Sequence, residues 1–313
     1  MSVKVFIDGS SGTTGLRIAD RLAQRPEIEL LSISAEGRKD VNERAKVINS
    51  ADLAFLCLPD AASKEVMPLL RPDVKVLDTS TAFRTDAAWD YGFPELKGQK
   101  EKIKNSDRVA VPGCYASGFI SIARPLVELG LAPADYPFSC TGISGYSGGG
   151  KKMIAEYESL NRPAHSKLDA PKSYGLGLAH KHLPEMQKIS GLAHTPMFVP
   201  VVCDYYCGMQ VLVPLDLTLA GSTAEQVAEG IAAYYKDAAT VKVHALNEAL
   251  PENGLYSNAM AGTDRMELYL TVNAAGDQMM LVSVFDNLGK GSSGAAVQCM
   301  NLMLGLEETE GLE

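Results

Sequence analysis

The sequence predicts an α/β protein of two domains: a doubly wound parallel sheet, then an α+β domain with a mixed sheet. Three observations support this prediction. The chain has 313 residues, too many for one small core and suitable for two domains. Over its first third, short apolar runs alternate with segments of helical periodicity, as in a parallel sheet covered by helices. Farther along, longer extended runs are separated by few helices, which is typical of a sheet with antiparallel strands.

The first domain is expected to span residues 1–113 and to be completed by a C-terminal helix at 292–313. A strand at residues 3–7 leads into the glycine-rich stretch 9–15, after which apolar residues recur at helical spacing. The remaining elements expected in this domain are strands at 28–34, 52–59, 74–79 and 109–111 and a helix at 61–70.

The second domain is expected to span residues 114–291. A helix should begin near residue 115, and Pro125 should bend or restart it because proline lacks the N–H that a helix interior needs. The other elements expected here are extended runs at 209–219, 267–272 and 279–285 and a helix at 223–235. We expect a mixed sheet of this kind to carry the contacts of a homo-oligomer, either a dimer or a tetramer.

Composition and charge exclude several classes of protein. Hydrophobic residues make up 46% of the chain and charged residues 21%, without the long apolar run of a membrane span. The net charge is −9, and no basic cluster is longer than a pair, so we expect no binding to nucleic acid. The first residues show no export signal, and the six scattered cysteines do not resemble a disulfide framework. We therefore expect a cytoplasmic protein with free thiols.

The stretch GSSGTTG at residues 9–15 follows a predicted strand and precedes a predicted helix. Glycines there would let the backbone approach a pyrophosphate, while the N–H groups at the helix start would bind its charge. The alternative is a tight strand-to-helix turn without a ligand. The candidate contacts of a dinucleotide are Gly9, Ser11, Gly12, Thr13, Thr14 and Gly15.

The end of the second predicted strand favours NADP over NAD. An NAD site usually places an acidic residue about 20 residues after the glycine loop, where it binds the ribose hydroxyls. In this chain Ser34 is followed by Arg38 and Lys39, a combination that suits a 2′-phosphate. Glu36 is the one acidic residue nearby, and the alternative is that the two cations are ordinary solvated loop charges.

Cys114 follows the turn Pro112-Gly113 and precedes the predicted helix. A thiol at a helix N-terminus meets the positive end of the helix dipole and free N–H groups, which favour the thiolate. The same N–H groups can stabilise an oxyanion on a carbonyl that the sulfur attacks. The alternative is a small buried residue in a tight turn. The setting favours a nucleophile.

Two histidines, His180 and His182, lie two residues apart and would share one face if the segment were extended. They are candidates for the acid or base that a thiolate mechanism needs. A zinc site is the alternative, but no third ligand follows at a typical spacing, and Cys203 and Cys207 stand in an apolar run. We therefore expect no metal. Three isolated histidines are expected in surface or core positions: His165, His194 and His244.

Arg84 follows the fourth predicted strand on the side of the sheet where α/β proteins bind ligands. Its guanidinium could bind a phosphate through two N–H groups, or it could form a surface salt bridge instead.

Several motifs together resemble one family. They are GSSGTTG at 9–15, DTSTAFR at 78–84, YGFPEL at 91–96, VPGCYASG at 111–118, SGYSGGG at 144–150, HKHLPEM at 180–186 and DNLGKGSSGAAVQCMN at 286–301. In this combination the sequence resembles the shorter class of the N-acetyl-gamma-glutamyl-phosphate reductases, NADPH-dependent enzymes of arginine biosynthesis. The segment 198–208 departs from the pattern of the longer class, PHLxPMxRG.

The resemblance implies a Rossmann-like NADP-binding domain and a semialdehyde dehydrogenase-like α+β domain. It implies that Cys114 attacks an acyl phosphate, that phosphate leaves, and that NADPH reduces the resulting thioester while His180 moves the proton. It also implies substrate contacts at Arg84, Ser144, Gly145, Tyr174, His182 and Glu185, and places Asn287 and Lys290 beside the nicotinamide.

Two kinds of alternative remain open. Reductases of aspartyl phosphate or of a carrier-bound aminoadipyl phosphate share the chemistry and differ in the substrate. A nucleotide-sensing regulator would keep the dinucleotide domain without catalysis, and Cys114 and His180 would then have no chemical role.

Overall fold

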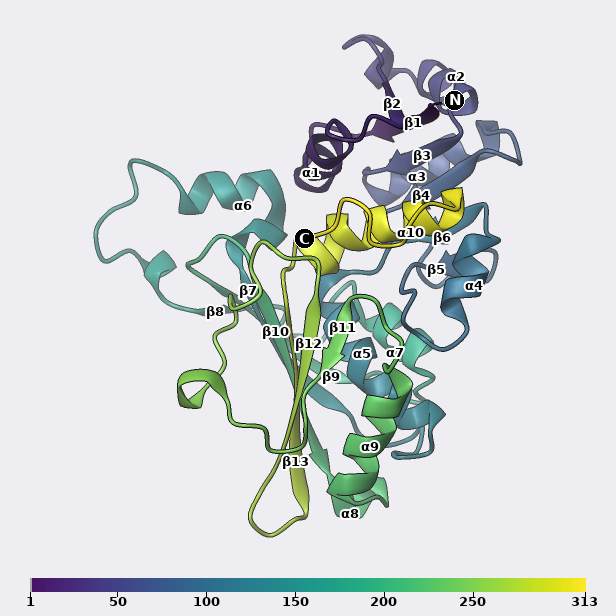
Figure 1. The fold of residues 1–313 in the computed structure, drawn as a ribbon. Helices are drawn as coiled ribbons and strands as arrows, with labels where there is room; N and C mark the ends of the chain where they lie inside the picture. The colour runs from purple at the N-terminus through teal and green to yellow at the C-terminus, as the bar shows by residue number, and fades with distance from the viewer. Residues whose placement is uncertain (1) are drawn as a thin grey trace. The chain divides into compact units, whose positions relative to one another are not determined.

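The computed structural model describes residues 2–313; Met1, the first residue of the expected first domain, lies outside them, and Glu252 is described by its backbone alone. The chain divides into two compact units (Figure 1). The first unit is Met1–Gly113 with Ser292–Leu312, and the second is Cys114–Gly291 with Glu313. None of the helices in residues 2–313 has the length and apolar character needed to cross a membrane.

The first unit contains a six-stranded sheet in the order β2-β1-β3-β4-β6-β5, and every neighbouring pair is parallel. Its strands are β1 (Val3–Asp8), β2 (Ile28–Leu31), β3 (Leu53–Leu56), β4 (Lys75–Asp78), β5 (Asp90–Tyr91) and β6 (Arg108–Ala110). Because β2 and β3 lie on opposite sides of β1, the carboxyl end of β1 is a topological switch point. The predicted doubly wound parallel sheet is confirmed.

Helices cover both faces of this sheet. One face packs against α1 (Thr13–Leu22), α4 (Gln99–Lys104) and α10 (Gly294–Leu304), and the other against α2 (Val41–Ser50) and α3 (Asp60–Val66). Alternate residues of β1 enter the two cores, since Val5 and Ile7 lie in one and Phe6 in the other. Burial on both faces explains why these strands are continuous apolar runs in the sequence. Figure 1 shows α10 beside α4, although the two are far apart in the chain.

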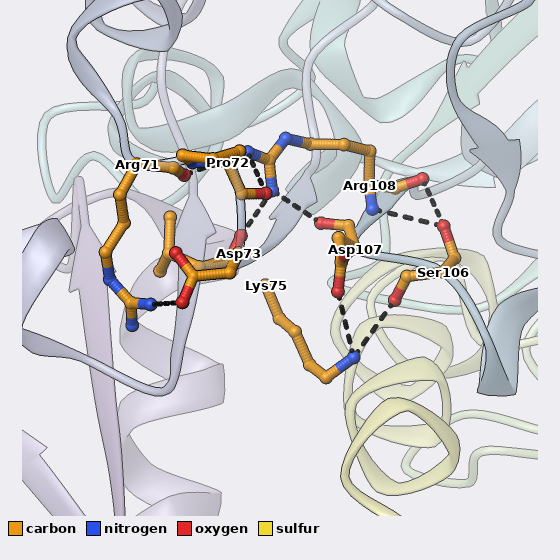
Figure 2. Close-up of polar contacts among 8 residues, drawn as sticks. Arg71, Pro72, Asp73, Lys75, Ser106, Asp107 and Arg108 are labelled. Atoms are coloured by element: carbon orange, nitrogen blue, oxygen red, sulfur yellow. Dashed lines mark hydrogen bonds and ion pairs between the residues drawn. The ribbon is translucent and has the colours of Figure 1, made fainter.

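A polar network fixes the amino ends of β4 and β6 (Figure 2). The Arg108 guanidinium donates to the backbone carbonyls of Arg71 at 3.3 Å, Pro72 at 3.2 Å and Asp107 at 2.8 Å, and also to that of Val74. Lys75 donates to the Asp107 carboxylate at 3.1 Å. These contacts satisfy loop carbonyls at the amino ends of the strands, whereas the glycine loop lies at the carboxyl end of β1. They therefore stabilise the fold away from the strand ends where α/β proteins bind ligands.

The second unit contains a seven-stranded mixed sheet in the order β11-β12-β13-β10-β7-β9-β8. The pairs β7–β9 and β11–β12 are parallel, and the other four are antiparallel. The strands are β7 (Ser139–Gly145), β8 (Lys172–Ser173), β9 (Met197–Cys203), β10 (Met209–Asp216), β11 (Val241–Val243), β12 (Met266–Val272) and β13 (Gln278–Phe285). The predicted mixed α+β domain is confirmed.

One face of this sheet is covered by α5 (Cys114–Glu128), with α7 (Leu183–Ser190) and α9 (Ala224–Tyr234) beside it. The helix α5 packs closely on β10 and β13 at Gly118. A Cβ there would lie only 2.5 Å from Val211 Cγ2, so a larger residue would not fit without a shift. The shorter helices of the unit are α6 (Gly150–Tyr157) and α8 (Leu217–Ala220). Short 3₁₀ segments occur at Gly37–Lys39, Met67–Leu69, Tyr146–Gly149, Lys167–Asp169 and Pro251–Asn253, and a π-helical turn at Gly289–Ser293.

Of the two predicted effects of Pro125, a bend or a restart of its helix, the restart is wrong. The helix α5 runs without interruption from Cys114 to Glu128 with Pro125 inside it. Proline has no N–H for the carbonyl of Ser121, four residues earlier, and the Tyr235 hydroxyl donates to that carbonyl instead, at 2.7 Å. The side chain of Tyr235, 114 positions from Ser121 in the chain, thus replaces the missing donor.

Several predicted boundaries were too long. The strand expected at 28–34 ends at Leu31, and the run expected at 209–219 ends at Asp216, where α8 begins. The C-terminal helix expected at 292–313 spans Gly294–Leu304 only, because Gly305, at φ 69°, ends it in the left-handed conformation.

Candidate active site

Cys114 is the first residue of α5 and is half-buried. The first turn of α5 contains no acidic residue, so the positive end of the helix dipole acts on the thiol without a nearby carboxylate on that turn. Gly291 packs closely against this position, since a Cβ there would lie 3.0 Å from Cys114 Cβ. The structure thus places the predicted nucleophile in the setting that favours a thiolate.

His180 lies in the same unit and is surrounded by aromatic rings. Its ring centroid is 5.8 Å from that of Tyr115, 5.9 Å from Tyr174, 4.7 Å from His182 and 5.1 Å from Phe198. Burial lowers the pKa of His180 to about 4, and the charge of Lys181 adds to this effect. His180 is therefore neutral at neutral pH.

One ring nitrogen of His180 is held by the backbone. The N–H of His182 donates to His180 Nδ1 at 3.2 Å. A neutral imidazole whose Nδ1 accepts a hydrogen bond carries its proton on Nε2. His180 can therefore donate a proton or a hydrogen bond through Nε2 only.

The second histidine of the pair is in a different position. His182 is the N-cap residue of α7, and Glu185 lies in the first turn of that helix; their exposed fractions are 5% and 2%. The segment is thus a turn entering a helix, and the extended conformation considered from the sequence is wrong. The rings of His180 and His182 still touch, at an interplanar angle of 83°.

Two tyrosines lie near Cys114. Tyr174 follows β8, and its backbone N–H donates to the carbonyl of Pro200 at 3.1 Å. Burial raises the pKa of both Tyr174 and Tyr115, and the negative charge of a Cys114 thiolate raises both further. The two hydroxyls therefore stay protonated at neutral pH and can donate hydrogen bonds. The sequence reasoning assigned no role to Tyr115, although its position directly after Cys114 was a signal.

Ser144 and Gly145 end β7. The Ser144 hydroxyl is buried and donates to the carbonyl of Gly145 at 3.0 Å. A Cβ at Gly145 would lie 2.6 Å from the carbonyl oxygens of Tyr205 and Tyr206. Gly145 thus lets β7 approach the loop after β9 closely.

Asn287 and Lys290 are both buried within the second unit, with exposed fractions of 1% and 2%. The side-chain oxygen of Asn287 accepts from the N–H of Gly208 at 2.8 Å, and its side-chain nitrogen donates to the Ser147 hydroxyl at 3.0 Å. Lys290 lies in the π-helical turn Gly289–Ser293. The structure thus shows Asn287 joining three segments of the unit, a role that the sequence did not indicate.

In the first unit the glycine loop lies at the switch point of the sheet. Gly9 has a φ of +87°, and a Cβ there would overlap the carbonyl of Cys57. A Cβ at Gly15 would lie 2.5 Å from the Gly9 carbonyl oxygen, so the loop folds tightly under the start of α1. Thr13 begins α1, the Thr14 hydroxyl is 3.0 Å from the Ser292 hydroxyl, and Ser11 is exposed.

This loop suits a dinucleotide phosphate. The first turn of α1 has no acidic residue, and three glycines keep side chains away from the backbone N–H groups. The one nearby carboxylate, Asp8, is buried and paired with Arg44, whose Nε lies 2.8 Å from Asp8 Oδ2. Its charge is therefore compensated.

Ser34, Arg38 and Lys39 lie in the turn after β2, and all three side chains are exposed. The N–H of Gly37 donates to the Ser34 hydroxyl at 3.0 Å, which shapes the turn. Across residues 2–313, no carboxylate forms an ion pair with Arg38 or Lys39.

Arg84 is buried, with 7% of its surface exposed, so the alternative of a surface salt bridge is wrong. Its Nε donates to the carbonyl of Val111, and one terminal nitrogen donates to the carbonyl of Thr79, both at 2.9 Å. The guanidinium thus joins the carboxyl ends of β4 and β6. Its partner after β6, Val111, lies three residues before Cys114 in the chain.

No group of three or more histidine, cysteine, aspartate or glutamate side chains within residues 2–313 could hold a metal ion. His244 is hydrogen-bonded to Glu248 at 2.8 Å and Glu267 at 2.9 Å and stacks on Tyr269. All six cysteines are free thiols.

Comparisons with known proteins agree with this arrangement. The model of the semialdehyde dehydrogenase NAD binding domain matches residues 4–106, and that of the semialdehyde dehydrogenase dimerisation domain matches residues 114–287. A solved aspartate semialdehyde dehydrogenase from Francisella tularensis superposes with a TM-score of 0.71 at 15% identity, covering 96% of this chain and 100% of the other. Aspartate semialdehyde dehydrogenase II from Vibrio cholerae gives 0.68 at 18% identity, covering 97% and 99%.

Two curated relatives are more similar in sequence. The N-acetyl-gamma-glutamyl-phosphate reductase of Trichormus variabilis (strain ATCC 29413 / PCC 7937) is 46% identical over 99% of this chain and 99% of its own. The enzyme of that name from Burkholderia cenocepacia (strain HI2424) is 46% identical over 96% of this chain and 97% of its own.

The two units and the site thus define a semialdehyde dehydrogenase-type oxidoreductase with a nicotinamide cofactor. Within that class, the chain belongs to the N-acetyl-gamma-glutamyl-phosphate reductase family, as the sequence motifs predicted. The match to the semialdehyde dehydrogenase dimerisation domain indicates that the protein forms a homo-oligomer.

Proposed function

We propose that this protein reduces N-acetyl-gamma-glutamyl phosphate to N-acetylglutamate semialdehyde with NADPH and releases phosphate, a step of arginine biosynthesis. The observation that carries the proposal is the placement of Cys114 at the start of α5, in the unit where Tyr115, Tyr174 and His182 surround His180. The full-length similarity to reductases of this name selects the substrate.

The proposed reaction has two stages at Cys114. The thiolate attacks the acyl carbon, the bond from that carbon to the phosphate oxygen breaks, and a thioester remains on the protein. The positive end of the α5 dipole and the N–H groups of its first turn stabilise the oxyanion of this step. The bound cofactor supplies the hydride that reduces the thioester. The thiohemiacetal then breaks its C–S bond, which releases the aldehyde and restores the thiolate.

His180 is the proposed proton carrier of the second stage. Its neutral ring presents Nε2–H, so it donates to the thiohemiacetal oxygen as negative charge develops there. When the C–S bond breaks, Nε2 takes the proton back. Tyr174, His182, Glu185, Ser144 and Gly145 stay proposed substrate contacts, and Arg84 a proposed phosphate contact.

We propose NADP as the cofactor, with Gly9, Gly12 and Gly15 framing the pyrophosphate site and Asn287 and Lys290 near the nicotinamide. The unpaired, exposed cations Arg38 and Lys39 support a 2′-phosphate site. The double variant Arg38→Ala/Lys39→Ala should weaken NADPH binding about tenfold or more and leave NADH binding unchanged, because exposed cations act only on the extra phosphate. Cofactor fluorescence titration measures both; equal loss for the two cofactors would argue against this site.

We propose that copies associate through the face of the second sheet that α5 does not cover, as a dimer or tetramer. This face has a hollow of about 510 Å³ and another of about 210 Å³. Leu212, Tyr269, Met280 and Val282 supply apolar surface in the smaller hollow. The free thiols suit a reducing compartment, and we propose the cytoplasm as the location.

The reaction is tested in reverse, which avoids an unstable acyl phosphate. Purified protein, NADP and phosphate are mixed with N-acetylglutamate semialdehyde, aspartate semialdehyde or aminoadipate semialdehyde, and NADPH absorbance is followed. We expect phosphate-dependent reduction of NADP with the first semialdehyde alone. Activity with another semialdehyde would change the substrate, and silence with all three in a protein that binds NADPH would indicate a nucleotide sensor.

A further inference from the structure

Tyr115 occupies a central place in the second unit that the proposed reaction leaves unexplained. It follows Cys114 on the first turn of α5, and only 4% of its surface is exposed. Its ring lies directly on the backbone of β7, where a Cβ at Gly142 would overlap it. The absence of a side chain at Gly142 therefore permits this packing.

Contacts of Tyr115 reach the other elements of the site. Its hydroxyl donates to the carbonyl of Val201 on β9 at 3.3 Å. β9 pairs with β8, the strand that leads to Tyr174. Its ring meets the His180 ring edge-on at 5.8 Å, and Phe198 on β9 packs against both rings at 5.1 Å.

We propose that Tyr115 is a positioning residue, which fixes the first turn of α5 against the ring of His180 and so sets the orientation of the proton carrier. The inference rests on the proposed role of His180. It adds that the orientation of the His180 ring depends on Tyr115, a residue of the helix that begins with the nucleophile. Tyr115 does not act on the substrate in this proposal.

A neighbour on the same helix provides the matched control. Phe119 lies one turn farther along α5, is fully buried, and packs edge-on against Phe138 at 6.0 Å. Within residues 2–313, no histidine ring packs against the ring of Phe119. Tyr115→Leu and Phe119→Leu both remove an aromatic ring from the buried side of α5. Only Tyr115→Leu removes a ring that packs against His180.

The first test is the titration of His180, followed by NMR in the whole protein. The groups around its ring are Tyr115, Tyr174, Lys181 and His182. Tyr115→Leu should raise the pKa of His180 from about 4 toward 6.5, because water reaches the ring, whereas Phe119→Leu should leave it unchanged. Unchanged titration in folded Tyr115→Leu protein would overturn the inference, and this readout does not depend on activity.

The second test is a kinetic cycle with His180→Asn. Tyr115→Leu should lower kcat by about 10- to 100-fold with little change in KM, since small misplacements of a catalytic group have effects of this size. In the His180→Asn background, Tyr115→Leu should lower kcat by less than about a further threefold, because the histidine ring that Tyr115 positions is absent. An equal loss in both backgrounds would overturn the inference and assign Tyr115 to packing alone.

Gly142→Ala provides a second route if Tyr115→Leu fails to fold. It displaces the ring without changing it, so it should also raise the pKa of His180 and lower kcat. A normal titration and kcat in Gly142→Ala would count against Tyr115. Full activity of His180→Asn would instead refute the proposed proton carrier, while the titration still decides the position of its ring.

Discussion

Cys114 differs from the other free thiols of the chain in its surroundings. Burial raises the pKa of Cys57 to about 12 and also raises that of Cys140 and Cys203. Those thiols stay protonated at neutral pH. Cys114 instead stands at the start of a helix whose first turn lacks acidic residues. At the scale of single residues, the reactive group is therefore selected by its position on a helix.

The first prediction concerns this thiol. Cys114→Ser should abolish turnover, because a serine hydroxyl at this site is not ionised and forms no thioester. NADPH affinity, measured by fluorescence titration, should stay unchanged. Cys207→Ser, at another half-buried free thiol, is the control and should remain active. Appreciable turnover by Cys114→Ser would refute the covalent mechanism.

The second prediction concerns the choice of histidine. His180→Asn should lower kcat by about 10²- to 10⁴-fold, the usual contribution of general acid–base catalysis. His182→Asn should have the smaller effect, because His180 presents the protonated Nε2 while His182 occupies the N-cap position of α7. Steady-state kinetics in the reverse direction measures both variants. A larger loss for His182→Asn would transfer the role to that residue.

The third prediction follows from the lowered pKa of His180. A histidine with a folded-state pKa near 4 and an unfolded value of 6.5 binds fewer protons when folded. Its contribution therefore leaves stability intact above about pH 6.5 and reduces it as the pH falls from 6.5 toward 4. Between pH 7.5 and 4.5, the Tm of His180→Asn should fall less than that of the wild type. Parallel losses of Tm would contradict the burial of a neutral ring.

At the scale of elements, α5 combines a chemical and a structural function. Its N-terminus holds the nucleophile, and its interior contains a proline that helices usually exclude. The helix stays intact because the Tyr235 hydroxyl donates to the Ser121 carbonyl. A contact from outside the helix thus keeps the helix that carries Cys114 continuous.

The fourth prediction tests that contact. Tyr235→Phe should lower the free energy of unfolding by about 1–2 kcal/mol, the usual effect of leaving a buried acceptor unsatisfied. With Pro125→Ala the helix regains its own N–H at this position, so Tyr235→Phe should then have a smaller effect. Urea unfolding of the four proteins measures the difference. Equal effects in the two backgrounds would show that the hydroxyl acts elsewhere.

The sequence predicts elements well where the pattern is local. The strand β1, the glycine loop and α1 follow one another as a continuous apolar run, three glycines and a helical period. The sequence did not predict strands whose pairing partners lie far away in the chain. β7, SCTGISG, has little apolar alternation, and β8 has only two residues, yet both pair with β9.

The same distinction applies to the candidate site. Cys114 and His180 stand in local motifs, so they could be chosen from the sequence. The place of Tyr115 depends on Gly142 and Phe198, which are distant in the chain. The burial of Arg84 depends on the carbonyls of Thr79 and Val111 at the ends of two strands. Thr79 is local to Arg84, but Val111 lies 27 residues away, and the local motif does not indicate this second partner.

At the scale of the whole molecule, the protein is a homo-oligomer whose second unit contains both the site and a sheet face that α5 does not cover. That face carries Met280, which is 36% exposed and lines both hollows. An apolar side chain between two hollows suits contact with a second copy.

The fifth prediction concerns assembly. Met280→Asp should shift the protein toward monomer, because a carboxylate at the centre of a contact would lose its water without gaining a partner. Leu219→Asp on α8, at a residue 62% exposed and outside both hollows, is the matched control and should leave the assembly intact. Light scattering after gel filtration measures the mass. An unchanged oligomer with Met280→Asp would place the contact on another surface.

The glycines packed around the site affect how a mutational survey of this protein should be interpreted. Gly142 underlies Tyr115, Gly145 meets the carbonyls of Tyr205 and Tyr206, and Gly291 lies against Cys114. None of the three has a side chain that could bind, ionise or react. In a library scored by growth without arginine, we expect substitutions at these positions to be depleted as strongly as those at Cys114. Intolerance to substitution alone would then fail to distinguish the residues that carry out the chemistry from the glycines whose lack of a side chain makes room for them.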